Sequence, residues 1–227
     1  MTRIVNNCVA LVCLCLFWGQ SLRAADASHS EQIKWGNESV FNEEHNTLGL
    51  FSGVLGGQIV LAGGTSDDYS RWGRNAVCLS ENAGFALYED VLSKPLAYGA
   101  SITLSDGILC IGGRDSSQCY EDVFFVTMQQ GKLNVSEDWP PLPFPLSNAA
   151  GALLDNKVYL FGGRKSVSPS RLSDSFFVLD LSNKSRGWKE LPGYPGCVRE
   201  DAILVVQNNG VSPCLYLLGG QTETEEG

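Results

Sequence analysis

Histidine and basic side chains are scarce in this sequence. Its 227 residues include two histidines, and 16 Lys and Arg stand against 25 Asp and Glu, which gives a net charge of −9. So few imidazoles leave little room for a histidine-rich metal site or a Ser-His-Asp triad. No basic patch is evident in this acidic chain, so we expect no nucleic-acid partner.

Long apolar runs are also missing. The apolar run near the N-terminus, Val9–Trp18, has ten residues, which is too short to span a bilayer comfortably. Arg3 precedes it and small residues, Ala24 and Ala25, follow it, which is the layout of a secretory signal peptide. We predict that residues 1–25 are a signal peptide, and that the mature protein is secreted or periplasmic with no stable membrane span. The alternative is an uncleaved N-terminal anchor.

The cysteines show no disulfide framework. Five of the eight lie beyond residue 25, and their spacing fits no CxxC metal pattern. Export would permit disulfides, but Cys110 and Cys214 lie in apolar, strand-like runs, where a buried free thiol is the simpler expectation. We therefore predict free thiols at Cys78, Cys110, Cys119, Cys197 and Cys214.

Glycine, in contrast, is abundant and marks a repeat. An apolar strand that ends in Gly-Gly recurs four times, and the second glycines stand 49, 50 and 57 residues apart. A strand with small residues precedes each phrase, and a tight turn joins the two, which is a hairpin signal. The Gly-Gly phrases occupy residues 58–64, 107–113, 157–163 and 214–220, and the preceding strands occupy 48–55, 97–104, 148–154 and 199–206.

After each of the first three Gly-Gly phrases, a polar loop leads to two further strands. The third strands are predicted at 75–80, 122–128 and 174–181, and the fourth at 85–92, 133–139 and 187–192. Four short strands in a period of about 50 residues are typical of kelch repeats, which form propeller blades. Trp139 and Trp188 occupy the kelch tryptophan position. A β-sandwich with chance Gly-Gly pairs would not explain four hairpins in register.

The sequence therefore predicts an all-β, kelch-type β-propeller of four-stranded blades, here partial and covering residues 31–227. Blades are expected to start near residues 48, 97, 148 and 199, and the fourth stops after its second strand. Residues 31–41 resemble a lone outer strand. Gly-Gly is expected where a Cβ would clash with the neighbouring blade. Three blades and a half indicate an open, partial propeller, which is a fragment, a truncated gene product or half of an assembly. Its open edge would favour self-association or instability.

One face of such blades gathers candidate binding residues. In a four-stranded meander, the loop after the second strand and the link before the first strand open on the same side, and loops on a rigid scaffold often carry function. An arginine there can grip a carboxylate with two hydrogen bonds, and a neighbouring carboxylate can move protons. The alternative is that these charges only solvate loop tips. The candidates are Arg71, Tyr98, Arg114, Asp115, Arg164 and Arg199, with Arg114 and Arg164 first because both follow Gly-Gly at the same blade position.

Three segments carry a resemblance to a known family. GLFSGVLGGQIVLAGG, LAYGASITLSDGILCIGG and LPFPLSNAAGALLDNKVYLFGG resemble the exported kelch proteins called N-acetylneuraminate epimerases, or sialic acid mutarotases, in the blade order of the cyclically permuted branch. The resemblance covers about residues 45–220. It implies a six-bladed propeller and an isomerase that interconverts the anomers of sialic acid outside the cytoplasm, with no metal or organic cofactor. The glutamate proposed as proton acceptor in that family has no matching position here, so the catalytic residues remain unassigned.

Two functions follow from these observations. The first is a sialic acid mutarotase, inactive if the missing blades are needed, whose partner is a small-molecule sugar. The second is a non-catalytic kelch module that binds a glycan or a protein. A third hypothesis, a copper radical oxidase on a galactose oxidase-like propeller, is discounted because His29 and His45 both precede the first complete blade, so a copper site on the propeller face lacks its imidazole ligands. It would predict copper uptake.

Overall fold

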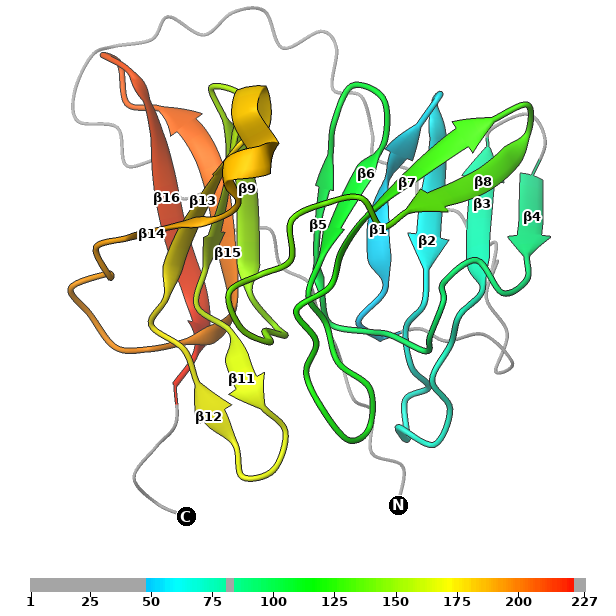
Figure 1. Cartoon of the computed structure of the whole chain (residues 1–227), viewed down its shortest axis with the longest axis horizontal. Helices are drawn as coiled ribbons and strands as arrows, with labels where there is room; N and C mark the ends of the chain where they lie inside the picture. The colour runs from blue at the N-terminus through cyan, green and yellow to red at the C-terminus, as the bar shows by residue number, and fades with distance from the viewer. Residues whose placement is uncertain (1–47, 81–83, 223–227) are drawn as a thin grey trace, which may run out of the picture. The chain divides into compact units, whose positions relative to one another are not determined.

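The computed structural model describes residues 48–80 and 84–222, which fold almost entirely into antiparallel β-sheets (Figure 1). The predicted signal peptide at 1–25, the predicted strand at 31–41 and both histidines lie outside these ranges. Within them, three four-stranded sheets and one long two-stranded hairpin follow one another along the chain. The two small strands β11 and β12 form a further sheet of their own.

Each four-stranded sheet is a meander in which neighbours in sequence are neighbours in space. The first holds β1 (Phe51–Leu55), β2 (Gln58–Ala62), β3 (Ala76–Ser80) and β4 (Gly84–Tyr88), and the second holds β5 (Ala100–Thr103), β6 (Ile108–Ile111), β7 (Val123–Gln129) and β8 (Lys132–Ser136). The third holds β9 (Ala150–Leu154), β10 (Lys157–Phe161), β13 (Phe176–Asp180) and β14 (Lys189–Leu191), and the last hairpin holds β15 (Glu200–Asn208) and β16 (Pro213–Gln221). The predicted all-β fold with four-stranded blades is confirmed.

Two elements of the structure were not predicted from the sequence. The loop after the third Gly-Gly carries a small hairpin, β11 (Arg164–Ser166) and β12 (Arg171–Leu172), in a polar segment without apolar alternation. A 3-10 helix, η1 (Leu181–Arg186), follows β13, and the Asp180 carboxylate caps it by accepting a hydrogen bond from the Ser182 N–H. Both elements lie in connections, so they leave the order of the main strands unchanged.

The core fills the spaces between successive sheets, because one twisted sheet cannot bury its own faces. Phe51 of β1 meets Phe124 of β7 with ring centroids 5.2 Å apart, and these rings belong to an apolar cluster shared by the first and second sheets. A second cluster joins the second and third sheets. A third, which includes Phe161 and Leu204, joins the third sheet to the last hairpin.

The Gly-Gly phrases form the joints between neighbouring blades. A Cβ built on Gly112, whose φ is +62°, would lie 2.2 Å from the carbonyl oxygen of Leu146 in the next blade's link. Gly113 donates its N–H to the same oxygen at 2.8 Å. The predicted reason for Gly-Gly is thereby confirmed, since the backbone of the next blade occupies the space that a side chain would need. The loops that follow these glycines lie at one end of the sheets, the end of β11 and β12 in Figure 1.

Candidate functional site

Four residues that occupy the same position in the four repeats are linked by a row of backbone hydrogen bonds at this end of the sheets. Gly49, Tyr98, Asn148 and Asp201 all have left-handed φ angles, between +54° and +64°. Tyr98 donates its N–H to the Gly49 carbonyl at 2.8 Å, Asn148 to Tyr98 at 2.7 Å, and Asp201 to Asn148 at 3.0 Å. These bonds bring three polar side chains from three successive blades side by side. Non-glycine residues with such φ angles are uncommon and cluster at functional sites.

Arg114 lies beside this row of hydrogen bonds, with its guanidinium over two aromatic rings. The central carbon of its guanidinium is 4.6 Å from the centroid of the Tyr98 ring and 5.1 Å from that of the Trp72 ring. Tyr69 stacks on Tyr98 with centroids 6.4 Å apart. Within residues 48–80 and 84–222, no carboxylate forms an ion pair with Arg114. Its cation is therefore held in place by rings and remains able to bind an anion. Tyr98, Arg114, Asn148 and Asp201 are called the axial cluster below.

Arg164, at the equivalent position of the next blade, already forms an ion pair within the protein. Its Nε donates to Oε2 of Glu200 at 2.8 Å, and its terminal nitrogen contacts the other carboxylate oxygen. The Glu200 side chain is 10% exposed, so this pair ties the third sheet to the last hairpin with little solvent screening. One blade earlier, the position of Glu200 is taken by Ser147, which carries no charge. This single difference leaves Arg114, and not Arg164, available to a ligand.

Replacing Glu200 by glutamine is expected to destabilise the fold by about 1–3 kcal/mol, because it leaves the partly buried Arg164 cation without its counter-charge. Thermal and urea unfolding of the two proteins measure this. Asp106→Asn at an exposed hairpin turn is the matched control and is expected to change stability by less than about 0.5 kcal/mol. Equal stability of E200Q and the unmodified chain would show that the pair does not hold the hairpin.

The remaining groups of the axial cluster supply both hydrogen-bond donors and hydrogen-bond acceptors. Asn148 donates its Nδ2 to Oδ1 of Asp201 at 2.8 Å, and its own Oδ1 is buried with no hydrogen-bond partner among the described residues. Burial raises the pKa of Tyr98, as do Tyr69 and the Asp201 carboxylate, while the Arg114 cation opposes this. The Tyr98 hydroxyl therefore stays protonated at neutral pH. An unsatisfied acceptor, a protonated phenol, a carboxylate and a cation meet in one place.

The other sequence candidates have structural tasks. Asp115 accepts hydrogen bonds from the Tyr120 hydroxyl at 2.6 Å and from the N–H groups of Ser117 and Gln118. Burial raises the pKa of Asp115, but these hydrogen bonds outweigh it and lower the pKa to about 2. This carboxylate therefore stays ionised and organises its own loop. Arg199 donates to the Gly219 carbonyl at 2.8 Å.

Arg71 is exposed on the first loop of the same end, and its carbonyl accepts a hydrogen bond from the Thr65 hydroxyl at 2.7 Å. Sequence reasoning missed Tyr69 and Trp72, which flank Arg71 in the same loop. Trp72 donates its indole N–H to the backbone carbonyl of Tyr69 at 3.1 Å, and this bond holds the Trp72 ring against the backbone of its own loop. Two aromatic residues in the loop that follows the first Gly-Gly were the available signal for them.

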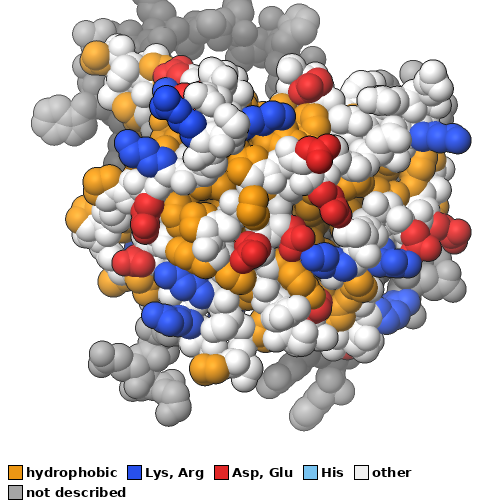
Figure 2. Space-filling model, viewed as in Figure 1, with side chains coloured by type: hydrophobic (Ala, Val, Ile, Leu, Met, Phe, Trp, Pro, Cys, Tyr) orange, Lys and Arg blue, Asp and Glu red, His pale blue; other side chains and the backbone are white. Residues whose placement is uncertain are grey.

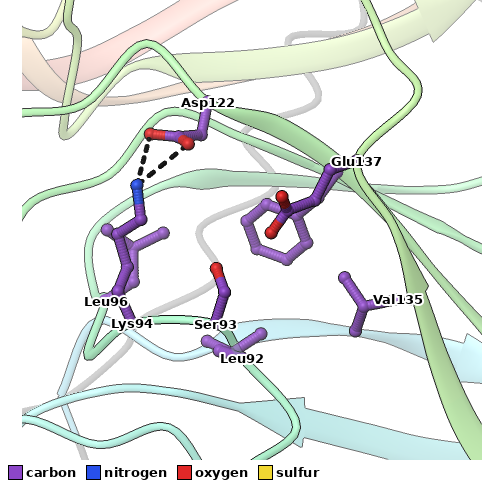
Figure 3. A pocket seen from close by; sticks show the side chains of 8 residues that line it. Leu92, Ser93, Lys94, Leu96, Asp122, Val135 and Glu137 are labelled. Atoms are coloured by element: carbon purple, nitrogen blue, oxygen red, sulfur yellow. Dashed lines mark hydrogen bonds and ion pairs between the residues drawn. The ribbon is translucent and has the colours of Figure 1, made fainter.

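A hollow between the first two sheets has a different character (Figure 3). Lys94 donates to both oxygens of Asp122, at 2.9 and 3.0 Å, and Glu137 and Val135 stand on the opposite wall. Its interior volume is about 10 Å³, room for about one water molecule. It is too small for a sugar ring, and the Lys94–Asp122 pair serves to join the sheets.

Two larger hollows lie elsewhere on the described surface, one of about 600 Å³ whose lining includes Lys157, Arg186 and Lys189, and one of about 540 Å³ whose lining includes Trp139 and Lys184. Acidic and basic side chains are interspersed with apolar ones on the face shown in Figure 2, without a large patch of one charge. In residues 48–80 and 84–222, no three His, Cys, Asp or Glu side chains converge as a metal site would require. All five cysteines there are free thiols. No helix of this part of the chain has the length and apolar character needed to cross a membrane.

Comparison with known proteins agrees with this geometry. The kelch motif model matches residues 145–192, which span the third sheet from the link before β9 to the end of β14. The solved structure of YjhT superimposes with a TM-score of 0.61, at 13% identity, over 77% of this chain and 62% of that one. The fold is of the kelch propeller type.

Sequence relatives of this kelch propeller share one description. An N-acetylneuraminate epimerase of Vibrio cholerae is 31% identical over 106 residues, which are 47% of this chain and 25% of that protein. N-acetylneuraminate epimerases of Yersinia pestis and Haemophilus influenzae are 32% and 30% identical over 39% and 40% of the chain. The chain is thus homologous to these epimerases over part of its length, and the aligned region spans about a quarter of theirs or less.

Proposed function

We propose that the axial cluster binds an acidic sugar of the sialic acid class and that the protein interconverts the anomers of that sugar. The observation that carries the proposal is Arg114, a cation without a carboxylate partner among the described residues, held against Tyr98 and Trp72. A guanidinium binds a carboxylate with two parallel hydrogen bonds, and sialic acids carry one carboxylate. The homology to proteins described as N-acetylneuraminate epimerases supports the same ligand.

The proposed reaction needs one proton to move. The hydroxyl on the anomeric carbon loses its proton, the bond between that carbon and the ring oxygen breaks, and the ring oxygen gains a proton. Closing the open form on the opposite face gives the other anomer, with no change in composition or oxidation state. Asp201 is the carboxylate of the axial cluster, and Asn148 orients it through the 2.8 Å hydrogen bond. A carboxylate at this place supplies the general base that such a proton transfer requires.

The proposed setting is outside the cytoplasm. It is based on the predicted signal peptide in residues 1–25, which has the charged, apolar and small-residue parts of an export signal. A sugar-binding protein exported in this way would meet free sialic acid released from glycans. Cell fractionation, followed by N-terminal sequencing of the secreted or periplasmic form, tests the signal independently of any activity.

NMR of freshly dissolved N-acetylneuraminate follows the approach to anomeric equilibrium directly. We expect the purified protein to accelerate it, and Asp201→Asn to lower the enzymatic rate by about 100-fold or more. Asp106→Asn, at an exposed turn of the second sheet, is the matched control and is expected to keep full activity. No acceleration above buffer would contradict catalysis. Saturable sugar binding without acceleration would instead support the non-catalytic binding module.

A further inference from the structure

The hollow of about 540 Å³ lies between the second and third sheets, each of which has all four of its strands. The turn between β5 and β6 contributes Ser105 to its lining, and η1 contributes Lys184. Because Tyr98 precedes β5 and Ser105 follows it, this hollow and the axial cluster lie at opposite ends of the same sheets (Figure 1). It is called the inter-blade hollow below. Its volume falls within the roughly 300–1,000 Å³ of sites that bind small molecules.

A longer connection in the third sheet builds one wall of this hollow. β7 and β8 are joined by Gln130 and Gly131 alone, whereas β13 and β14 are joined by residues 181–188, which contain η1. Between the first two sheets, the Tyr88 hydroxyl donates to the Gly131 carbonyl at 3.1 Å, so the short turn is bonded directly to the preceding sheet. In the third sheet η1 takes the place of that turn and borders the inter-blade hollow.

The helix η1 is fixed to the hairpin turn of its own sheet. The Leu181 N–H donates to the Asn156 carbonyl at 3.0 Å, and the Asn156 side chain donates its Nδ2 to the Ser182 hydroxyl at 2.9 Å. At the other end, the Gly187 N–H donates to the Lys184 carbonyl at 3.0 Å. The backbone that carries Lys184 is therefore held in place before a ligand arrives, which reduces the entropy lost on binding.

Two hydrogen-bond donors of the hollow have no acceptor. The Lys184 Nζ lies 4.1 Å from the centroid of the Trp139 ring, and Trp139 packs on Phe125 with ring centroids 5.2 Å apart. Within the described part of the chain, no carboxylate pairs with Lys184 and no acceptor binds the Trp139 indole N–H. Trp188, at the same kelch position one blade later, donates its indole N–H to a backbone carbonyl at 3.0 Å. The ammonium and indole groups of the hollow thus remain available to an anion.

The other walls suit a ring that carries hydroxyl groups. Leu153, which is 38% exposed, and Phe125 supply apolar surface. Ser105 and Ser136 supply hydroxyl groups that can both donate and accept hydrogen bonds. Asp106 is the one carboxylate among the described residues of the lining, and it forms no ion pair with Lys184. A cation, apolar walls and hydroxyl groups are therefore combined in one hollow.

We propose that the inter-blade hollow is a second binding site, which takes a monosaccharide that carries a carboxylate. The carboxylate binds the Lys184 ammonium, the sugar hydroxyls exchange hydrogen bonds with Ser105 and Ser136, and the apolar edge of the ring lies against Leu153. An inorganic anion would use the cation and leave the apolar walls in water, so the lining favours the sugar acid. This site shares no residue with the axial cluster, and the proposal does not depend on the proposed reaction.

NMR titration of the full chain with D-glucuronate tests this, with the indole N–H signal of Trp139 as the local probe. Trp139→Phe assigns that signal. We expect a saturable shift, an affinity about 10-fold or more weaker in Lys184→Ala because a charge-assisted hydrogen bond is lost, and retained binding in K184R. Lys132→Ala removes an exposed lysine of β8 and is the matched control. Arg114→Ala should leave the shift unchanged, which separates this site from the axial cluster.

Several results would overturn the proposal. Absence of a saturable shift would show that the hollow takes no sugar acid, and equal affinity of K184A and the unmodified chain would show that Lys184 does not bind the carboxylate. D-glucose that binds as tightly as D-glucuronate would mean that the carboxylate is not recognised. Inorganic phosphate that binds as tightly would mean that charge alone is recognised. A loss in R114A but not in K184A would place the sugar acid at the axial cluster instead.

Discussion

Replacing Gly112 by alanine is expected to destabilise the fold by about 2–5 kcal/mol. Two costs add at this position. A left-handed φ, here +62°, costs an L-residue about 1–2 kcal/mol, and the new methyl group would stand 2.2 Å from the Leu146 carbonyl oxygen. That oxygen belongs to the backbone of the next blade, so the two blades must move apart to make room for the methyl group. Such overpacking costs a further amount of about 1–3 kcal/mol, the usual range for an added methyl group in a packed interior. Urea unfolding followed by tryptophan fluorescence measures the difference.

Gly131→Ala separates the two costs. Gly131 lies in the turn between β7 and β8 with a φ of +74°, and no atom of the described residues lies within 4 Å of a Cβ built there. Its replacement therefore carries the conformational cost alone, about 1–2 kcal/mol. If G112A and G131A were equally stable, the close approach of blades at Gly-Gly would not be what the repeat requires.

Replacing Arg114 by alanine is expected to lower the affinity for N-acetylneuraminate by about 10- to 100-fold. The loss corresponds to one charge-assisted, two-point contact with the sugar carboxylate, worth about 1.5–3 kcal/mol. Stacking on Tyr98 and Trp72 limits the guanidinium's rotamers before the ligand arrives, which reduces the entropy lost on binding. Isothermal titration calorimetry gives both affinities.

Two further variants locate that effect. Arg186→Ala removes an exposed arginine of η1 and should bind like the unmodified chain, although it changes the net charge equally. Arg114→Lys keeps the charge but loses the planar fork, and should give an intermediate affinity. Equal losses in R186A and R114A would mean that general charge attraction, and not a site at Arg114, binds the sugar.

The fold could be predicted from the sequence because its signal is local and repeated. The hairpin turn, the apolar alternation and Gly-Gly lie within about 20 residues of one another in every blade, and Gly63, Gly112 and Gly162 meet the same kind of contact. Because the same pattern recurs, each copy strengthens the prediction of a blade at the others. The small hairpin of β11 and β12 and the helix η1 occur once, so no second copy revealed them.

The candidate site was predicted only in part, because its selectivity depends on distant partners. Arg114 and Arg164 have the same place in the repeat, and their sequences gave no reason to separate them. The separation comes from Glu200, 36 residues beyond Arg164, and from the uncharged Ser147 one blade earlier. Tyr98 was predicted as a candidate because it lies in the link before the first strand of its blade. Its contact with Arg114 and Trp72, however, depends on how the loops of two neighbouring blades pack together.

Calorimetric titration of the unmodified chain with N-acetylneuraminate and with its methyl ester tests the central claim most directly. The two ligands share every group except the anionic carboxylate that Arg114 is proposed to bind. We predict saturable binding of the acid, binding of the ester that is about 10- to 100-fold weaker, and loss of this preference in R114A. Equal affinity for acid and ester, or a preference that persists in R114A, would contradict the assignment of the axial cluster as an acidic-sugar site.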